Sequence, residues 1–125
     1  MLRLDLPTES FWVDCPYGVR LLCKPLNTAI NQAAVMRAGR RVAAQPEAIL
    51  NDPDQVAGLR FSEAIVALAE LLVEAWEGVG SADGSEAAPL SPEGLRGLLS
   101  VPEIAAAFNQ GISAPLARLT AEGNA

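Results

Sequence analysis

Few side chains in this sequence could carry out catalysis, and they limit what the protein can do. The 125 residues contain no histidine, so no imidazole base is available to activate a serine or cysteine nucleophile. The remaining acid–base candidates are the carboxylates and the single lysine, Lys24. Cys15 and Cys23 lie in apolar segments, a setting more typical of small core residues than of reactive thiols. The sequence therefore predicts a protein that is not an enzyme.

The sequence predicts no metal and no cofactor either. Two cysteines without a histidine supply too few ligands for a structural zinc ion. Three glycines follow Trp76, but a dinucleotide-binding loop needs a strand before its glycines, and here a helix is expected. A calcium loop around Gly84 would need acidic residues in place of Val79 and Leu90. We therefore interpret residues 76–99, WEGVGSADGSEAAPLSPEGLRGLL, as a joint between helices.

The charge distribution argues against a nucleic-acid partner. Residues 1–45 carry six basic and three acidic residues, whereas residues 46–125 carry three basic and twelve acidic residues, for a net charge of -6. The acidic part would repel phosphates. The densest basic group is Arg37, Arg40 and Arg41, which we interpret as a solvated helix edge.

No membrane-spanning or secretory segment is expected. No stretch of about 18 residues is free of charged and polar side chains. The start of the chain, MLRLDLPTES, lacks an apolar run that is long enough for a signal peptide. A cytosolic protein with reduced thiols is therefore the expectation.

The N-terminal quarter predicts a β-hairpin followed by a helix. In FWVDCPYGVRLLCKPL, about residues 11–26, two runs of aromatic and branched residues flank a Pro-Tyr-Gly turn. Asn27 or Thr28 can cap a helix over about residues 28–44, which Pro46 helps to stop. An isolated hairpin is marginally stable in water, so it must pack against the helices.

A second helix is predicted over about residues 53–76, with Asp52 as its cap and Pro53 at its first position. At about 100° per residue, one apolar stripe runs along it, with a second stripe beside it and glutamates on the opposite side. The first stripe is Phe61, Ile65, Leu68, Leu72 and Ala75; the second is Val66, Val73 and Trp76; the glutamates are Glu63, Glu70, Glu74 and Glu77. We interpret the glutamate side as solvent-exposed.

Two further helices are predicted over about residues 91–99 and 101–120, each preceded by a serine cap, Ser91 and Ser100. Pro115 should kink or divide the last helix. The last helix also carries a broad apolar face that includes Phe108 and Ile112. The expected fold is α+β, mainly α: a single domain, 1–125, in which an N-terminal β-hairpin packs on a bundle of about four helices.

The order of these features resembles the small tail assembly chaperones of long-tailed, siphovirus-like bacteriophages and prophages. The resemblance spans most of the chain, and its landmarks are the following segments: FWVDCPYGVRLLCKPL, the helix ending in Trp76-Glu77-Gly78-Val79, the turn Asp83-Gly84, Leu90-Ser91-Pro92-Glu93, and PEIAAAFNQGISAPLARLTAEGN. Its loop, SEAAP, is less polar than the family pattern. The motifs are not catalytic, and each is also ordinary helix punctuation, so the resemblance depends on their order.

The resemblance implies a non-catalytic protein of the bacterial host cytoplasm that coats the tape-measure protein before the tail tube polymerises around it. The resemblance further implies that the protein is then released, and we expect it to be absent from the mature particle. The major tail tube protein is a second candidate partner, and self-association into a homo-oligomer is a further possibility. The alternative function is a permanent structural component of the neck or tail.

The predicted client surface lies on the second and last helices, with Trp76 and Phe108 as aromatic anchors and Val73 and Ile112 beside them. Trp76 lies off the main stripe of its helix and next to the joint, and Phe108 precedes the break expected at Pro115. The alternative is that both aromatic residues belong to the core.

Overall fold

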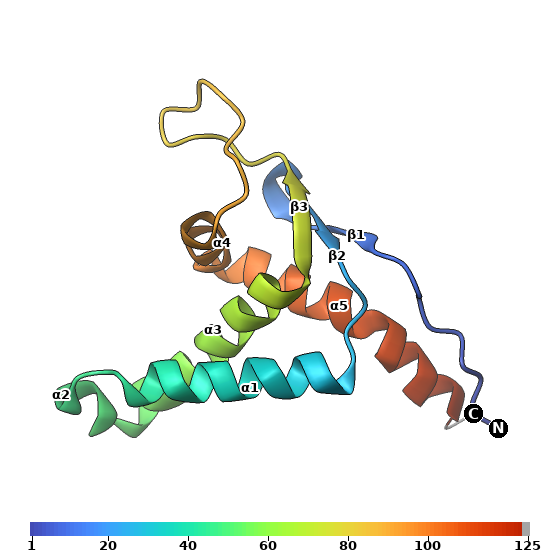
Figure 1. Ribbon diagram of the computed structural model, residues 1–125, viewed down its shortest axis with the longest axis horizontal. Helices are drawn as coiled ribbons and strands as arrows, with labels where there is room; N and C mark the ends of the chain where they lie inside the picture. Colours follow the sequence, from blue (N-terminus) through green and yellow to red (C-terminus); the bar gives the residue numbers. More distant parts are fainter. Residues whose placement is uncertain (124–125) are drawn as a thin grey trace.

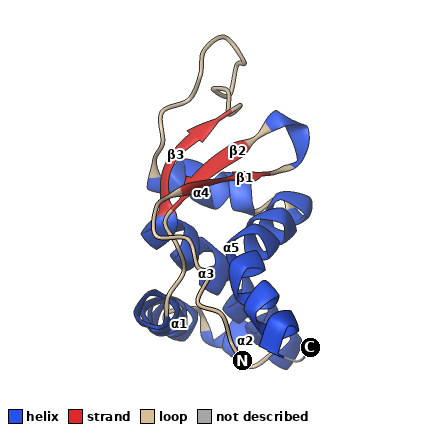
Figure 2. Cartoon of the chain, turned by 90° about the vertical axis from the view of Figure 1, so that its right-hand side faces the viewer, coloured by secondary structure: helices blue, strands red, loops and turns tan. Residues whose placement is uncertain are grey.

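The computed structural model describes residues 1–123 and confirms an α+β fold that is mainly α (Figure 1). The described elements are β1 (Phe11–Asp14), η1 (Pro16–Gly18), β2 (Arg20–Cys23), α1 (Thr28–Ala43), α2 (Glu47–Leu50), α3 (Pro53–Leu72), β3 (Val73–Glu77), α4 (Pro92–Leu99) and α5 (Pro102–Gly123). Figure 2 shows the strands toward one end of the molecule and helices α1 and α2 toward the other.

The N-terminal hairpin is part of a three-stranded antiparallel sheet with the order β1-β2-β3. Trp12 pairs with Leu22, and Leu21 pairs with Trp76. The predicted three-residue turn is present, since the backbone N–H of Cys15 donates to Val19 O at 2.8 Å across η1. Strand β3 thus gives the hairpin the third strand that an isolated hairpin lacks.

The prediction that the second helix continues to Trp76 is wrong, because α3 ends at Leu72 and the chain goes on as strand β3. The apolar spacing of this segment fits a helix, but β2 offers its backbone groups a set of sheet hydrogen bonds. The switch begins where the N–H of Lys24 donates to Leu72 O at 2.9 Å. Tertiary pairing therefore overrides local helical periodicity here.

Local capping residues start three of the helices as predicted. Asn27 Oδ1 accepts from the N–H of Ile30, Asp52 Oδ1 accepts from the first turn of α3, and Ser91 Oγ accepts from the N–H of Gly94. The prediction that Ser100 caps the start of the last helix is wrong. Its hydroxyl donates to Gly97 O at 2.6 Å, and Ser100 is the C-cap of α4. These caps fix where the helices begin.

Helix α5 runs through Pro115, so the predicted division of the last helix is wrong. Pro115 cannot donate to the carbonyl of Gly111, yet its ring is buried and α5 continues to Gly123. The apolar face of α5 therefore remains continuous where it packs on β1.

The core lies between the sheet and helices α3, α4 and α5. Its largest fully buried side chains are Phe108, Leu21, Leu72, Ile112 and Cys23. Leu95 and Leu99 add the apolar face of α4. Helix α1 packs along α3 after the chain turns through α2, and it contributes Ala34 to the same core (Figure 1).

Candidate partner-binding surface

The predicted client anchors are mostly core residues, which corrects the surface expected from the sequence. Phe108 is 0% exposed, and Val73 and Ile112 are also buried. Their elements, β3 and α5, bring these side chains into the main apolar cluster. An accessible anchor cannot be a side chain that the fold has already removed from water, so the prediction is wrong for these three residues.

Trp76 is half-buried and is engaged within the molecule. Its Nε1–H donates to Ala88 O at 2.8 Å, which ties strand β3 to the loop over residues 78–91. A Cβ at Gly94 would lie 2.6 Å from Cη2 of the indole, so the ring packs directly against α4. Trp76 therefore joins the sheet, the loop and α4.

The loop itself is closed by its own backbone and side chains. Gly80 and Ala87 form a bridge, and Gly84 has the positive φ expected of the Asp-Gly turn. Hydrogen bonds from Ser81 and Ser85 lower the pKa of Asp83 to about 2. These contacts lie within the loop. The loop connects strand β3 to helix α4, so the expected joint between two helices is corrected to a connection between a strand and a helix.

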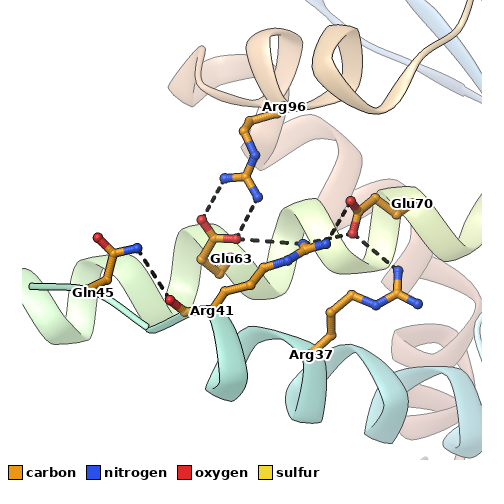
Figure 3. Close-up of polar contacts among 6 residues, drawn as sticks. All are labelled: Arg37, Arg41, Gln45, Glu63, Glu70 and Arg96. Carbon is orange, nitrogen blue, oxygen red and sulfur yellow. Dashed lines mark hydrogen bonds and ion pairs between the residues drawn. The ribbon is translucent and has the colours of Figure 1, made fainter. Parts of the chain in front are cut away.

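Glu63 on α3 is buried, although the sequence predicted a solvent-exposed glutamate side. Its side chain lies between α3 and α4, where the guanidinium of Arg96 donates to both carboxylate oxygens at 2.6 and 2.9 Å (Figure 3). Glu63 is 6% exposed. The hydrogen bonds from Arg96 lower the pKa of Glu63 despite burial, so the carboxylate is ionised at neutral pH. The sequence pattern of α3 could not predict this burial, because the partner of Glu63 is Arg96 of another helix, α4.

Glu70 forms the second half of the same cluster. Arg41 Nη2 donates to Glu70 Oε2 at 2.9 Å, and Arg37 Nη1 donates to Oε1 at 3.3 Å (Figure 3). Burial acts to raise the pKa of Glu70, but the hydrogen bonds from Arg41 and Arg37 outweigh it and the pKa is lowered. Arg41 Nη1 also lies 3.7 Å from Glu63 Oε2. The predicted solvated arginine edge is therefore wrong for Arg37 and Arg41, while Arg40 is exposed.

We call Arg37, Arg41, Glu63, Glu70 and Arg96 the ion cluster. It links α1, α3 and α4 by charge-assisted hydrogen bonds, some of them bidentate. Both carboxylates have a lowered pKa, which is unsuited to a general acid at neutral pH. The arrangement fits a structural role in holding the helices together.

The cysteine thiols are protonated at neutral pH, and the described acidic residues and cysteines form no metal site. Burial raises the pKa of the Cys23 thiol to about 12 and also raises that of Cys15, so neither is a thiolate at neutral pH. Among residues 1–123, no group of three or more histidine, cysteine, aspartate or glutamate side chains could hold a metal ion. Within the same range, none of the helices is long and apolar enough to cross a membrane.

An apolar groove of about 680 Å³ lies along the α1–α3 pair. One wall comes from α1: Val35, Met36, Ala38, Gly39, Arg40 and Ala43. The other wall comes from Arg60 and Ala64 of α3. We call this the α1–α3 groove.

Large apolar side chains are exposed at this groove. Val35 is 50% exposed and Met36 is 56% exposed. Phe61 is 63% exposed and lies three residues before Ala64, on an adjacent part of the surface of α3. The sequence placed Phe61 on the main apolar stripe of its helix, and the structure leaves this member of the stripe exposed. Val35, Met36 and Phe61 together expose apolar side-chain surface to solvent on the α1–α3 pair.

The open part of the α1–α3 groove, at Gly39 and Ala43, lies on the side of α1 opposite to the ion cluster. At about 100° per residue, Gly39 and Ala43 are turned roughly 200° from Arg37 and Arg41. The cluster can thus hold α1 on α3 from one side while the groove stays open on the other. This division leaves the groove accessible without loosening the helix pair.

A second groove of about 780 Å³ lies between the N-terminal segment, the start of α1 and the C-terminal half of α5. Leu26, Ile30 and Ile112 line it. One of its walls is the chain's own residues 6–10, which run over the apolar surface. The N-terminal segment of the chain therefore helps to form this groove.

In comparisons with known proteins, no family model, curated protein or solved structure matches this chain.

Proposed function

We propose that the chain is a non-catalytic tail assembly chaperone, which binds the tape-measure protein of a long-tailed bacteriophage or prophage before the tail tube polymerises around it. The proposal starts from the order of sequence motifs along the chain. The observation that carries it is the α1–α3 groove, which Val35 and Met36 line with exposed apolar side chains, with the exposed Phe61 next to groove residue Arg60 on α3. Such a surface serves binding better than catalysis.

An unassembled tape-measure protein would expose long apolar helical faces that need cover in the host cytoplasm. A groove between two helices can take such a face by helix-in-groove contact. The net charge of -6 would keep the complex in solution. The chaperone would leave when the tube forms, and the major tail tube protein is a second candidate partner.

The ion cluster supports this proposal by explaining how an open apolar groove coexists with a fixed fold. Arg41 and Arg37 hold α1 to Glu70 of α3, so the groove does not depend on a partner to keep its walls together. Preformed walls reduce the entropy cost of binding. The chain can then bind and release a client without refolding.

Co-expression with the tape-measure protein tests the proposal. We expect the native chain to raise the soluble fraction of the tape-measure protein severalfold and to co-purify with it. The double variant Met36→Gln/Phe61→Gln should lose most of this effect, because it removes apolar contact from the groove. Leu50→Gln is the matched control, since Leu50 is an exposed apolar residue on α2 outside the groove. A tape-measure protein that stays insoluble and unbound with the native chain would contradict the proposal.

A further inference from the structure

The charged side chains of the α1–α3 groove indicate which charges a bound partner should carry. Among the residues that the structure describes, Arg40 and Arg60 are the only charged side chains that line it, one from each wall. Among the described residues, Arg20, Arg37, Arg41 and Arg96 all form ion pairs, whereas Arg40 and Arg60 form none. The groove is thus an apolar surface with two free positive charges, on a chain whose net charge is negative.

We infer that the α1–α3 groove binds an amphipathic α-helix whose apolar stripe is flanked by carboxylates, with Arg40 and Arg60 pairing with acidic residues on its two sides. The inference rests on the proposed function, because the occupant would be a helical segment of the tape-measure client. Positive charges at the rim of an apolar groove select a partner with negative flanks and orient it during encounter.

The small residues of the α1 wall suit this occupant. Nothing lies within 4 Å of a Cβ placed at Gly39, so the surface there is open, and Ala38 and Ala43 flank it with short side chains. A helix of about 10 Å diameter could approach the backbone of α1 at this point. Val35, Met36 and Phe61 would then contact side chains spaced three and four residues apart along the client helix.

A second copy of the chain is a poorer fit than an acidic helix. In a two-fold symmetric contact the same patch meets itself, so Arg40 and Arg60 would approach the same arginines of the other copy. Like charges facing each other across an interface oppose association. Charge complementarity therefore favours an acidic client over self-association.

Two synthetic helical peptides with the same leucine stripe, one flanked by glutamates and one by lysines, test the inference by fluorescence anisotropy. We expect the glutamate peptide to bind at least tenfold more tightly to the native chain, with an advantage that shrinks as salt rises. The double variant Arg40→Glu/Arg60→Glu should reverse the preference. Equal binding of the two peptides, no binding of either, or an unreversed preference would overturn the inference.

A matched pair of glycine substitutions tests where the peptide binds. Gly39 and Gly58 are both exposed helical glycines with nothing within 4 Å of an added Cβ, but only Gly39 lines the groove. Gly39→Leu should weaken binding of the glutamate peptide at least tenfold, while Gly58→Leu should leave it within twofold. Equal effects of the two substitutions would overturn the location. Unchanged circular dichroism confirms that both variants fold.

Sedimentation tests whether a second copy of the chain occupies the groove, and co-purification distinguishes failure of the inference from failure of the proposed function. A dimer of the native chain that is lost in Gly39→Leu and kept in Gly58→Leu would assign the groove to a second copy and overturn the inference. If the tape-measure protein co-purifies equally with native chain and with Arg40→Glu/Arg60→Glu, the proposed function stands and the inference fails. If the peptides behave as expected but the tape-measure protein does not co-purify, the inference about the groove stands and the proposed function fails.

Discussion

Arg96 of α4 and Glu63 of α3 form a two-pronged ion pair, with Nη1 2.6 Å from Oε1 and Nη2 2.9 Å from Oε2. The carboxylate is buried while the guanidinium is half-exposed, so the pair lies at the edge of the core. It fixes α4 on α3 immediately after the loop over residues 78–91. Glu63 also attracts Arg41 of α1, which makes this carboxylate a contact point for three helices.

Removing Arg96 should therefore destabilise the fold more than removing another half-exposed side chain would, because its partner Glu63 is buried. In Arg96→Leu the buried Glu63 loses two hydrogen bonds and retains only the more distant Arg41. We expect a loss of about 1 to 3 kcal/mol in the free energy of unfolding, measured by urea denaturation. Arg118→Leu, at an exposed position on α5, is the control and should change stability by less than about 0.5 kcal/mol. Equal stability of Arg96→Leu and the native chain would contradict a structural role for the pair.

Acid should weaken the fold through the same cluster. The folded pKa values of Glu63 and Glu70 lie below the ordinary value of 4.5, so the folded state binds protons at these sites less readily than the unfolded chain. Their stabilisation is present above the ordinary pKa and is lost as the pH falls through the lowered folded pKa. We expect the melting temperature to fall steeply between about pH 5 and pH 3.

The double variant Glu63→Gln/Glu70→Gln identifies the source of this acid sensitivity. Its melting temperature should be lower at neutral pH but should depend less on pH over the same range. A pH dependence as steep as that of the native chain would assign the acid sensitivity to other carboxylates.

Phe108 and Phe61 should respond oppositely to truncation, because one is fully buried and the other is largely exposed. Phe108→Ala should cost about 3 to 5 kcal/mol of stability by leaving a cavity in the core. Phe61→Ala should change stability by less than about 0.5 kcal/mol and should reduce capture of the tape-measure protein. Thermal unfolding and co-purification of the two variants check both expectations. Early unfolding of Phe61→Ala would show that its ring supports the fold.

The loop should tolerate shortening at its tip but not at its base. Replacing residues 82–85 with Asn-Gly should leave the helical circular dichroism and the melting temperature unchanged, because this dipeptide forms a tight turn between the paired residues Ser81 and Glu86. Deleting residues 81–88 should cost about 1 to 3 kcal/mol, because Ala88 accepts from Trp76 Nε1. Equal stability of the two variants would show that this contact is dispensable.

Features that depend on neighbouring residues could be predicted from the sequence. The Asp52 and Ser91 caps, the tight turn after β1 and the Asp-Gly turn are set by side chains within a few residues of the backbone they satisfy. The α+β class followed from these local features. Strand β3 could not be predicted in the same way, because its stability comes from pairing with β2, more than 50 residues earlier.

The candidate site was harder to predict than the fold. Arg37 and Arg41 are four residues apart, and Glu63 and Glu70 are seven apart, so each pair lies on one side of its helix. This spacing is compatible with an ion cluster, but it does not say which helices meet. Nor does periodicity distinguish an apolar stripe that the core covers from one that stays open. Phe108, predicted as a client anchor, is therefore buried, whereas Phe61 on the main stripe of α3 is exposed.

A tail assembly chaperone should accompany the tape-measure protein during assembly and should not stay in the finished tail. The most direct measurement is quantitative mass spectrometry of two fractions from tail-producing cells: complexes captured through the tape-measure protein before tube formation, and purified mature particles. We predict that the chain is abundant in the first fraction and absent from the second. Its presence at a fixed ratio in mature particles would contradict the chaperone proposal and identify a structural neck or tail component instead.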